Sequence, residues 1–131
     1  MGHEKKALGK SFLIKFNDDI TKDEVKELDK LCQEVEELDP EYKVFIIDLS
    51  KVSKVDSPCL RPFIYLQSVI RKRSVSFLLI LEPKQPLKEN LLSIGGVRSD
   101  ELCRDRLQIA HILKKRPTSE QTCPKGILKV S

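Results

Sequence analysis

The feature that most constrains the fold is a short, uninterrupted apolar run at residues 44–47 (VFII), which ends in Asp48 and Leu49. A run this short, rich in β-branched and aromatic residues, is typical of a strand buried on both faces of a parallel sheet. A polar connection follows, and Asp56-Ser57-Pro58 then precedes apolar residues at helical spacing. Ser at a helix N-cap with Pro just inside is a common helix start. The segment therefore predicts a buried strand, a turn and a helix whose N-cap is Ser57.

Short apolar runs typical of strands and apolar residues at helical spacing recur along the chain, and together they indicate an α/β domain. Thr21 and Glu24 have the spacing of a capping box, and Gly95-Gly96 follows a short helical pattern as a helix C-cap would. Strands are expected at residues 12–16, 44–49, 75–81 and 102–103, and helices at residues 21–38, 57–73, 87–94 and 107–113. Strands and helices that alternate in this way predict a sheet of four to five mostly parallel strands, with about four helices packed on it.

Length and charge limit the classes of protein that fit. The 131 residues suffice for one domain, expected at residues 10–115 between flexible tails at 1–9 and 116–131, the second of them basic. The net charge of +4 is mild, and much of the excess follows residue 103, so we expect no direct nucleic-acid binding. No apolar run approaches the roughly 18 residues of a membrane span, and no signal peptide opens the chain. We therefore expect a cytoplasmic protein.

The residues that could carry chemistry are widely spaced. No two cysteines form a C-x-x-C pair, and the histidines are too few for a metal site or a disulfide framework with the usual spacing. These residues are Cys32, Cys59, Cys103, Cys123, His3 and His111. No Gly-rich phosphate loop follows a strand, and no nucleophile–base pair is evident. We therefore expect no catalytic residues, no metal and no cofactor.

Asp56-Ser57 is the one polar pair that stands out, and it admits two interpretations. In the first, Ser57 is only a helix N-cap and Asp56 a turn residue. In the second, Ser57 is a regulatory phosphorylation site. A phosphate would add roughly −1.5 to −2 charges at a helix N-terminus, where the helix dipole tolerates it but a docked partner would be repelled.

Three segments resemble the STAS domain (sulfate transporter and anti-sigma factor antagonist). They are residues 44–57 (VFIIDLSKVSKVDS), 76–81 (SFLLIL) and 91–97 (LLSIGGV), and the resemblance extends from about residue 9 to residue 115. The chain is similar above all to the bacterial single-domain anti-sigma factor antagonists of this family. The resemblance implies a STAS-like fold and a regulatory switch in which the protein itself catalyses no reaction and binds no cofactor. The resemblance further implies that the unphosphorylated protein binds a serine-kinase anti-sigma factor, that this kinase phosphorylates Ser57, and that a serine phosphatase restores binding.

The chain departs from the family pattern beside Ser57. Pro58 and Cys59 replace the family's second Ser and Gly, and Arg61 and Pro62 replace small or apolar residues. Because Pro in a helix interior costs about 3 kcal/mol or more, Pro62 is tolerable only if regular helix begins later than Ser57 suggests, with Pro62 in its first turn. The residues expected to bind a partner are Asp19, Ile20, Thr21, Asp56, Ser57, Pro58, Cys59 and Arg61.

An alternative function stays open. STAS-like modules also serve as accessory subunits of lipid or anion transport assemblies or of scaffolds, where helix faces pack on a partner and no Ser is phosphorylated. The irregular run at residues 58–62 (PCLRP) favours this interpretation.

Overall fold

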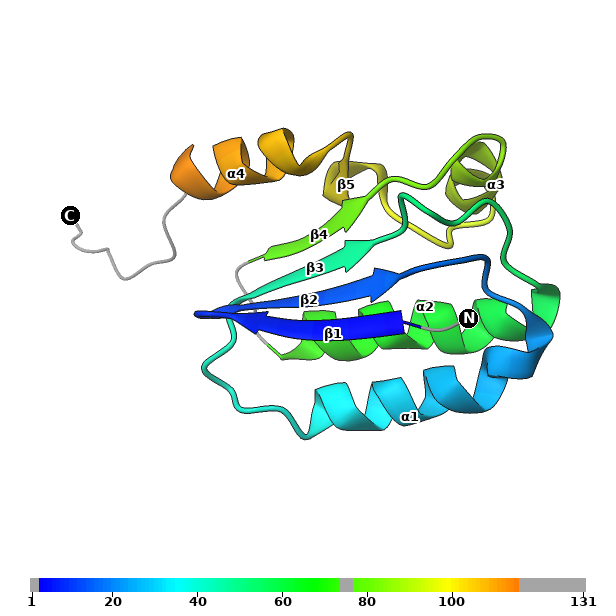
Figure 1. Cartoon of the computed structure of the whole chain (residues 1–131), viewed down its shortest axis with the longest axis horizontal. Helices are drawn as coiled ribbons and strands as arrows, with labels where there is room; N and C mark the ends of the chain where they lie inside the picture. Colours follow the sequence, from blue (N-terminus) through cyan, green and yellow to red (C-terminus); the bar gives the residue numbers. More distant parts are fainter. Residues whose placement is uncertain (1–2, 74–76, 116–131) are drawn as a thin grey trace.

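The computed structural model describes residues 3–73 and 77–115 and contains a five-stranded sheet in the order β1-β2-β3-β4-β5 (Figure 1). The elements in chain order are β1 (His3–Leu8), β2 (Ser11–Phe16), the 3₁₀ turn η1 (Lys22–Glu24), α1 (Val25–Glu36), β3 (Val44–Asp48), α2 (Ser57–Lys72), β4 (Phe77–Leu81), α3 (Leu87–Ser93), the 3₁₀ turn η2 (Ser99–Glu101), β5 (Leu102–Cys103) and α4 (Arg106–Lys115).

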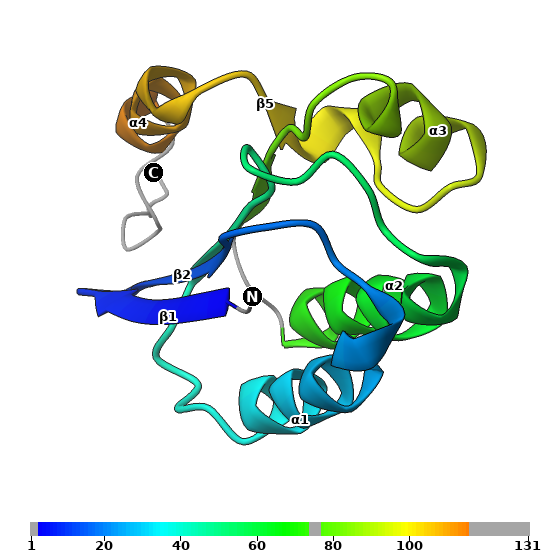
Figure 2. The same ribbon diagram turned by 45° about the vertical axis from the view of Figure 1, so that its right-hand side comes forward.

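The sheet is parallel from β2 to β5, and only β1 pairs with its neighbour in the antiparallel sense. Helices α1 and α2 connect successive parallel strands and lie on one face of the sheet, whereas α4 lies on the other (Figure 2). This arrangement confirms the predicted fold class, a mostly parallel sheet covered by helices. None of the described helices is long and apolar enough to cross a membrane.

The main core lies between the sheet and the α1–α2 layer. Alternate residues of β2 point into it, which confirms the period of two expected there, and Phe16 stacks edge-on against Phe63 of α2. Helix α1 contributes one apolar stripe that includes Leu28, Leu31 and Cys32, and all three side chains are buried. Strand β3 is buried at four of its five positions, three of them in the apolar run at residues 44–47, as the composition of that run predicts.

The N-terminal segment corrects the expectation of a flexible tail at residues 1–9. Residues 3–8 form strand β1, joined to β2 by a turn in which Gly9 has φ +63°. The strand is exposed along almost its whole length, so its sequence (HEKKAL) carries no apolar alternation. Backbone pairing with β2 and an ion pair between Lys5 and Glu34 hold it, and neither leaves a pattern in the sequence. The expected tail at 116–131 lies outside the described residues.

Helix α2 begins at residue 57 as predicted, but two other expectations about helix starts are wrong. No capping box forms at Thr21, whose side chain makes no cap hydrogen bond; the 3₁₀ turn η1 precedes α1 instead. Helix α2 already begins at Ser57, so Pro62 lies in its interior rather than in its first turn. Pro62 is buried there, and burial of its ring offsets part of the cost of the missing N–H.

The double glycine after α3 acts as the sequence predicts. Gly95 has φ +75°, its amide donates to the Leu92 carbonyl at 3.3 Å, and the Gly96 amide donates to the Leu91 carbonyl at 2.7 Å. This pair of bonds is the Schellman arrangement that ends a helix. The double glycine is therefore a helix C-cap.

Candidate functional site

Two loops that follow neighbouring parallel strands lie together at the carboxyl edge of the sheet. Ile20 and Val55 form an isolated parallel bridge, the Ile20 amide donates to the Lys54 carbonyl at 2.9 Å, and the Asp56 amide donates to the Ile20 carbonyl at 2.9 Å. We call residues 17–22 and 50–57 the loop platform. The structure thus brings together the two separate segments in which the sequence analysis expects partner-binding residues.

Two carboxylates fasten the loop platform from the outside. Asp19 accepts hydrogen bonds from the amide and hydroxyl of Ser53, at 2.7 and 2.9 Å. Asp56 accepts a bond from the Lys22 amide at 2.9 Å and pairs with the Lys54 ammonium at 3.4 Å. Bonds from Ser53 lower the pKa of Asp19, and the bond from the Lys22 amide lowers that of Asp56, because each stabilises the ionised form.

Ser57 is the first residue of α2, not its N-cap, which corrects the first interpretation of this pair. Asp56 occupies the N-cap position, yet its carboxylate turns toward Lys22 and makes no cap bond to α2. Ser57 is exposed, and its hydroxyl has no hydrogen-bond partner among residues 3–73 and 77–115.

The expected partner-binding residues differ in how far their side chains are exposed. Thr21, Pro58 and Arg61 are exposed, but Ile20 and Cys59 are fully buried. The expectation that these two side chains form part of a docking rim is therefore wrong. The Cys59 thiol donates to the Thr21 carbonyl at 3.0 Å, and burial raises its pKa, so this cysteine anchors the first loop to α2 and remains a protonated thiol.

A third carboxylate, that of Asp48 at the end of β3, is not among the residues predicted to bind a partner. Its side chain is only 2% exposed and accepts bonds from the Ser50 amide at 2.9 Å and hydroxyl at 2.6 Å. The Arg106 guanidinium of α4 lies 3.3 Å away. Burial alone would raise the pKa of Asp48, but the bonds from Ser50 and Arg106 outweigh it and hold this pKa below its usual value. An Asp directly after an apolar strand was the signal for this site.

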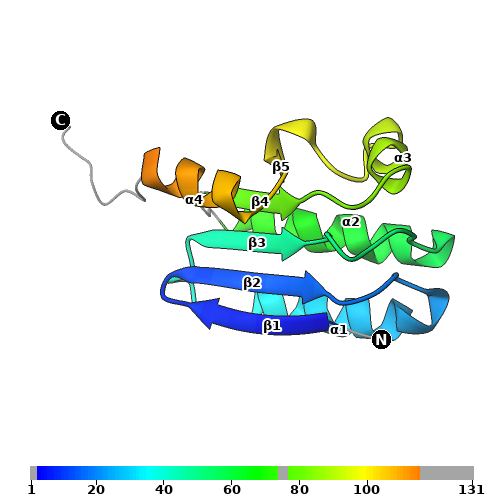
Figure 3. The same ribbon diagram turned by 45° about the horizontal axis from the view of Figure 1, so that its top comes forward.

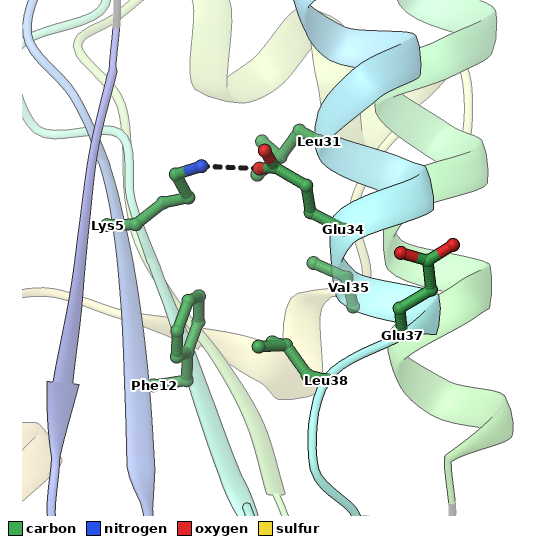
Figure 4. A pocket seen from close by; sticks show the side chains of 7 residues that line it. All are labelled: Lys5, Phe12, Leu31, Glu34, Val35, Glu37 and Leu38. Atoms are coloured by element: carbon green, nitrogen blue, oxygen red, sulfur yellow. Dashed lines mark hydrogen bonds and ion pairs between the residues drawn. The ribbon is translucent and has the colours of Figure 1, made fainter.

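A separate pocket of about 350 Å³ lies between β1, β2 and α1, at the end of α1 away from the loop platform (Figure 4). Its wall is mainly apolar, and the Lys5–Glu34 ion pair joins β1 to α1 within the lining. The lining residues are Lys5, Phe12, Leu31, Glu34, Val35, Glu37 and Leu38. Within the described ranges, no three His, Cys, Asp or Glu side chains are grouped so that they could hold a metal ion.

Comparison with solved structures reveals one shared fold. The chain matches the unphosphorylated form of the anti-sigma factor antagonist SpoIIAA at 12% identity and a TM-score of 0.63, over 88% of this chain and 99% of SpoIIAA. It matches a sulfate transporter family protein from Wolinella succinogenes at 19% identity and a TM-score of 0.64, over 85% of this chain and 93% of that protein.

Two further solved structures match the chain. The phosphorylated form of SpoIIAA from Bacillus matches at 10% identity and a TM-score of 0.64, over 85% of this chain and 99% of that one. SLC26A9 matches at 13% identity and a TM-score of 0.64, over 95% of this chain but only 23% of that protein. No family model and no curated protein matches the sequence. Since the sheet, the helices and these matches agree, the chain has the STAS fold, as the resemblance in its sequence predicts.

Proposed function

We propose that the protein is a regulatory binding module whose loop platform docks a partner protein and whose Ser57 is phosphorylated to release that partner. One observation carries the proposal: Ser57, the last residue of the loop platform, is exposed, and its hydroxyl has no bond to any described residue. A serine needed as a helix cap would be engaged. Serine kinases act on an accessible hydroxyl, and Ser57 offers one without loss of a native contact.

The local electrostatics explain why a phosphate would disrupt docking. Pro58 has no N–H, and the Cys59 amide already donates to the Asp56 carbonyl at 2.9 Å, so the start of α2 offers a phosphate few free donors. The carboxylates of Asp19 and Asp56 lie in the same platform and add like charge. A phosphate on Ser57 would therefore stay hydrated, and a docked partner would have to desolvate it.

The similar proteins support a proposal for the partners. Because the fold is that of SpoIIAA, solved in unphosphorylated and phosphorylated forms, we propose a serine-kinase anti-sigma factor as the partner and a serine phosphatase as the enzyme that reverses the switch. Both reactions would take place in the cytoplasm. The chain itself would act by binding and would need no catalytic residue or cofactor.

The proposal is tested by pulldown from native cytosol and mass spectrometry, with wild type, Ser57→Ala and Ser57→Asp as baits. A kinase or anti-sigma factor should be retained by wild type and Ser57→Ala and lost with Ser57→Asp. Ser99→Asp, which adds the same charge at an exposed serine of η2, is the matched control and should retain the partner. Equal retention by all four baits would overturn the switch.

A second candidate function is that of an accessory domain in a transport or scaffold assembly. It is supported by the exposed apolar side chains of Ile64 and Tyr65 on α2, which are 37% and 48% exposed and could pack on a partner without Ser57. The same pulldown distinguishes it. Retention of transporter subunits by all Ser57 baits, and their loss with an Ile64→Asp and Tyr65→Asp double variant, would support this second function.

A further inference from the structure

The sheet face opposite α1 and α2 is only partly covered. Figure 3 shows this face: α4 lies along β4, while β1 and β2 have no described helix in front of them. A small second core joins α4 to the sheet through Ile109, Leu79, Leu81 and Cys103. The apolar side chains on β1 and β2 lie beyond this core, and Leu8 remains 47% exposed.

A groove of about 210 Å³ runs between α4 and the uncovered strands. Its apolar lining comes from four strands and one helix, and includes Leu8 of β1, Leu13 of β2, Ile46 of β3, Leu81 of β4, and Ile109 and Leu113 of α4. A cleft of this size with a mainly apolar lining suits a hydrocarbon chain better than a compact polar ligand.

Positive charge lies along the groove. The Arg106 side chain lines it, is 66% exposed and gives one bond at 3.3 Å to Asp48, which leaves most of its five N–H donors free. Strand pairing places Lys6 opposite Leu13, and Lys15 two residues beyond Leu13, on the same face. Glu4 opposes Lys15, and Asp48 is already bonded to Ser50, so cations exceed free carboxylates on this face.

We propose that this groove binds a fatty-acid anion, with the hydrocarbon chain between α4 and strands β1–β3 and the carboxylate paired with Arg106. The planar guanidinium suits a carboxylate because it can donate two parallel bonds. Charge complementarity favours an anion over an amine. The groove is a concavity walled by α4 and the sheet, which favours a monomeric chain over the flat surface of a bilayer.

The test is isothermal titration of the full chain with decanoate, decanol and decylamine, each below its micelle concentration. Wild type should bind decanoate about tenfold more tightly than decanol, which corresponds to about 1.4 kcal/mol for the added pair. Arg106→Gln should remove this preference and leave decanol binding, whereas Arg106→Lys should keep part of it. Leu8→Ser, at an exposed lining position, should weaken both ligands.

The controls separate this site from the rest of the molecule. Arg61→Gln, which removes an exposed arginine on the opposite layer, and Ser57→Asp should both leave decanoate affinity unchanged. Equal affinity of wild type for decanoate and decanol, or the absence of saturable binding, would overturn the proposal. So would binding to phosphatidylserine vesicles without any binding of monomeric decanoate, because this face would then be a membrane surface.

Discussion

The Asp19 carboxylate accepts hydrogen bonds from both the amide and the hydroxyl of Ser53, 34 positions further along the chain. The donors lie 2.7 and 2.9 Å from the same oxygen. This contact joins the loop after β2 to the loop after β3, and so fixes the surface beside Ser57. Asp19 is therefore a positioning residue of the loop platform, in addition to any contact it makes with a partner.

We expect Asp19→Ala to loosen the loop platform without unfolding the domain. The variant leaves the Ser53 amide without its acceptor, so amide hydrogen exchange at residues 50–56 should accelerate several-fold while the core strands stay protected. Asp19→Asn, which keeps an oxygen acceptor, should show a smaller effect. Asp29→Ala, at an exposed position of α1, is the control. Unchanged exchange at residues 50–56 in Asp19→Ala would show that the backbone bridge at Ile20 suffices.

Thermal unfolding should distinguish the roles of Ser57 and Asp56. Because the Ser57 hydroxyl has no described partner, Ser57→Ala should change the free energy of unfolding by less than about 0.5 kcal/mol. Asp56→Ala removes the acceptor of the Lys22 amide and should lower the melting temperature clearly more. A loss with Ser57→Ala as large as with Asp56→Ala would restore the interpretation of Ser57 as a structural cap.

Pro62 offers a test of helix energetics. Pro in a helix interior is about 3 kcal/mol less favourable than Ala, whereas the two ring methylenes lost in Pro62→Ala contribute about 0.8 kcal/mol each when buried. We therefore expect Pro62→Ala to stabilise the domain by about 1 kcal/mol in urea unfolding. Pro58→Ala, in the first turn where no helix bond is lost, is the matched control and should give no comparable gain. Destabilisation by Pro62→Ala would mean that packing of the ring outweighs the helix bond.

The parts of the fold that the sequence predicts are those decided by burial. The apolar run of β3 and the 3.6-residue stripe of α1 are each set by which side chains face the core, so composition and period identify them. Strand β1 has no such pattern, because an exposed edge strand is held by backbone pairing. Its Lys5–Glu34 pair joins residues 29 positions apart and cannot be read from either segment alone.

The candidate site shows the same division. The proximity of the two loops could be expected, since carboxyl ends of neighbouring parallel strands meet at one edge of the sheet. The capping of α2 could not be predicted, because the Asp56 carboxylate accepts a hydrogen bond from the Lys22 amide, a tertiary contact, and makes no cap bond to α2. The burial of Cys59 could not be predicted from its own segment either, since it depends on contact with Thr21 of another loop. Local rules place Ser57 at a helix start, and long-range contacts decide what it does there.

Asp48 should make stability depend on pH in the acid range. Its pKa is lowered in the folded state, so its stabilising contribution is complete above the unfolded pKa of about 3.9 and is lost as pH falls through the lower folded value. Asp48→Asn removes the negative charge of the carboxylate that accepts hydrogen bonds from Ser50 and Arg106. We expect it to lower the free energy of unfolding by about 1–3 kcal/mol at pH 7, measured in urea. The difference from wild type should shrink steadily below pH 4, because protonation of Asp48 removes the same charge. A difference that is independent of pH would show that Asp48 acts through its shape and hydrogen bonds rather than its charge.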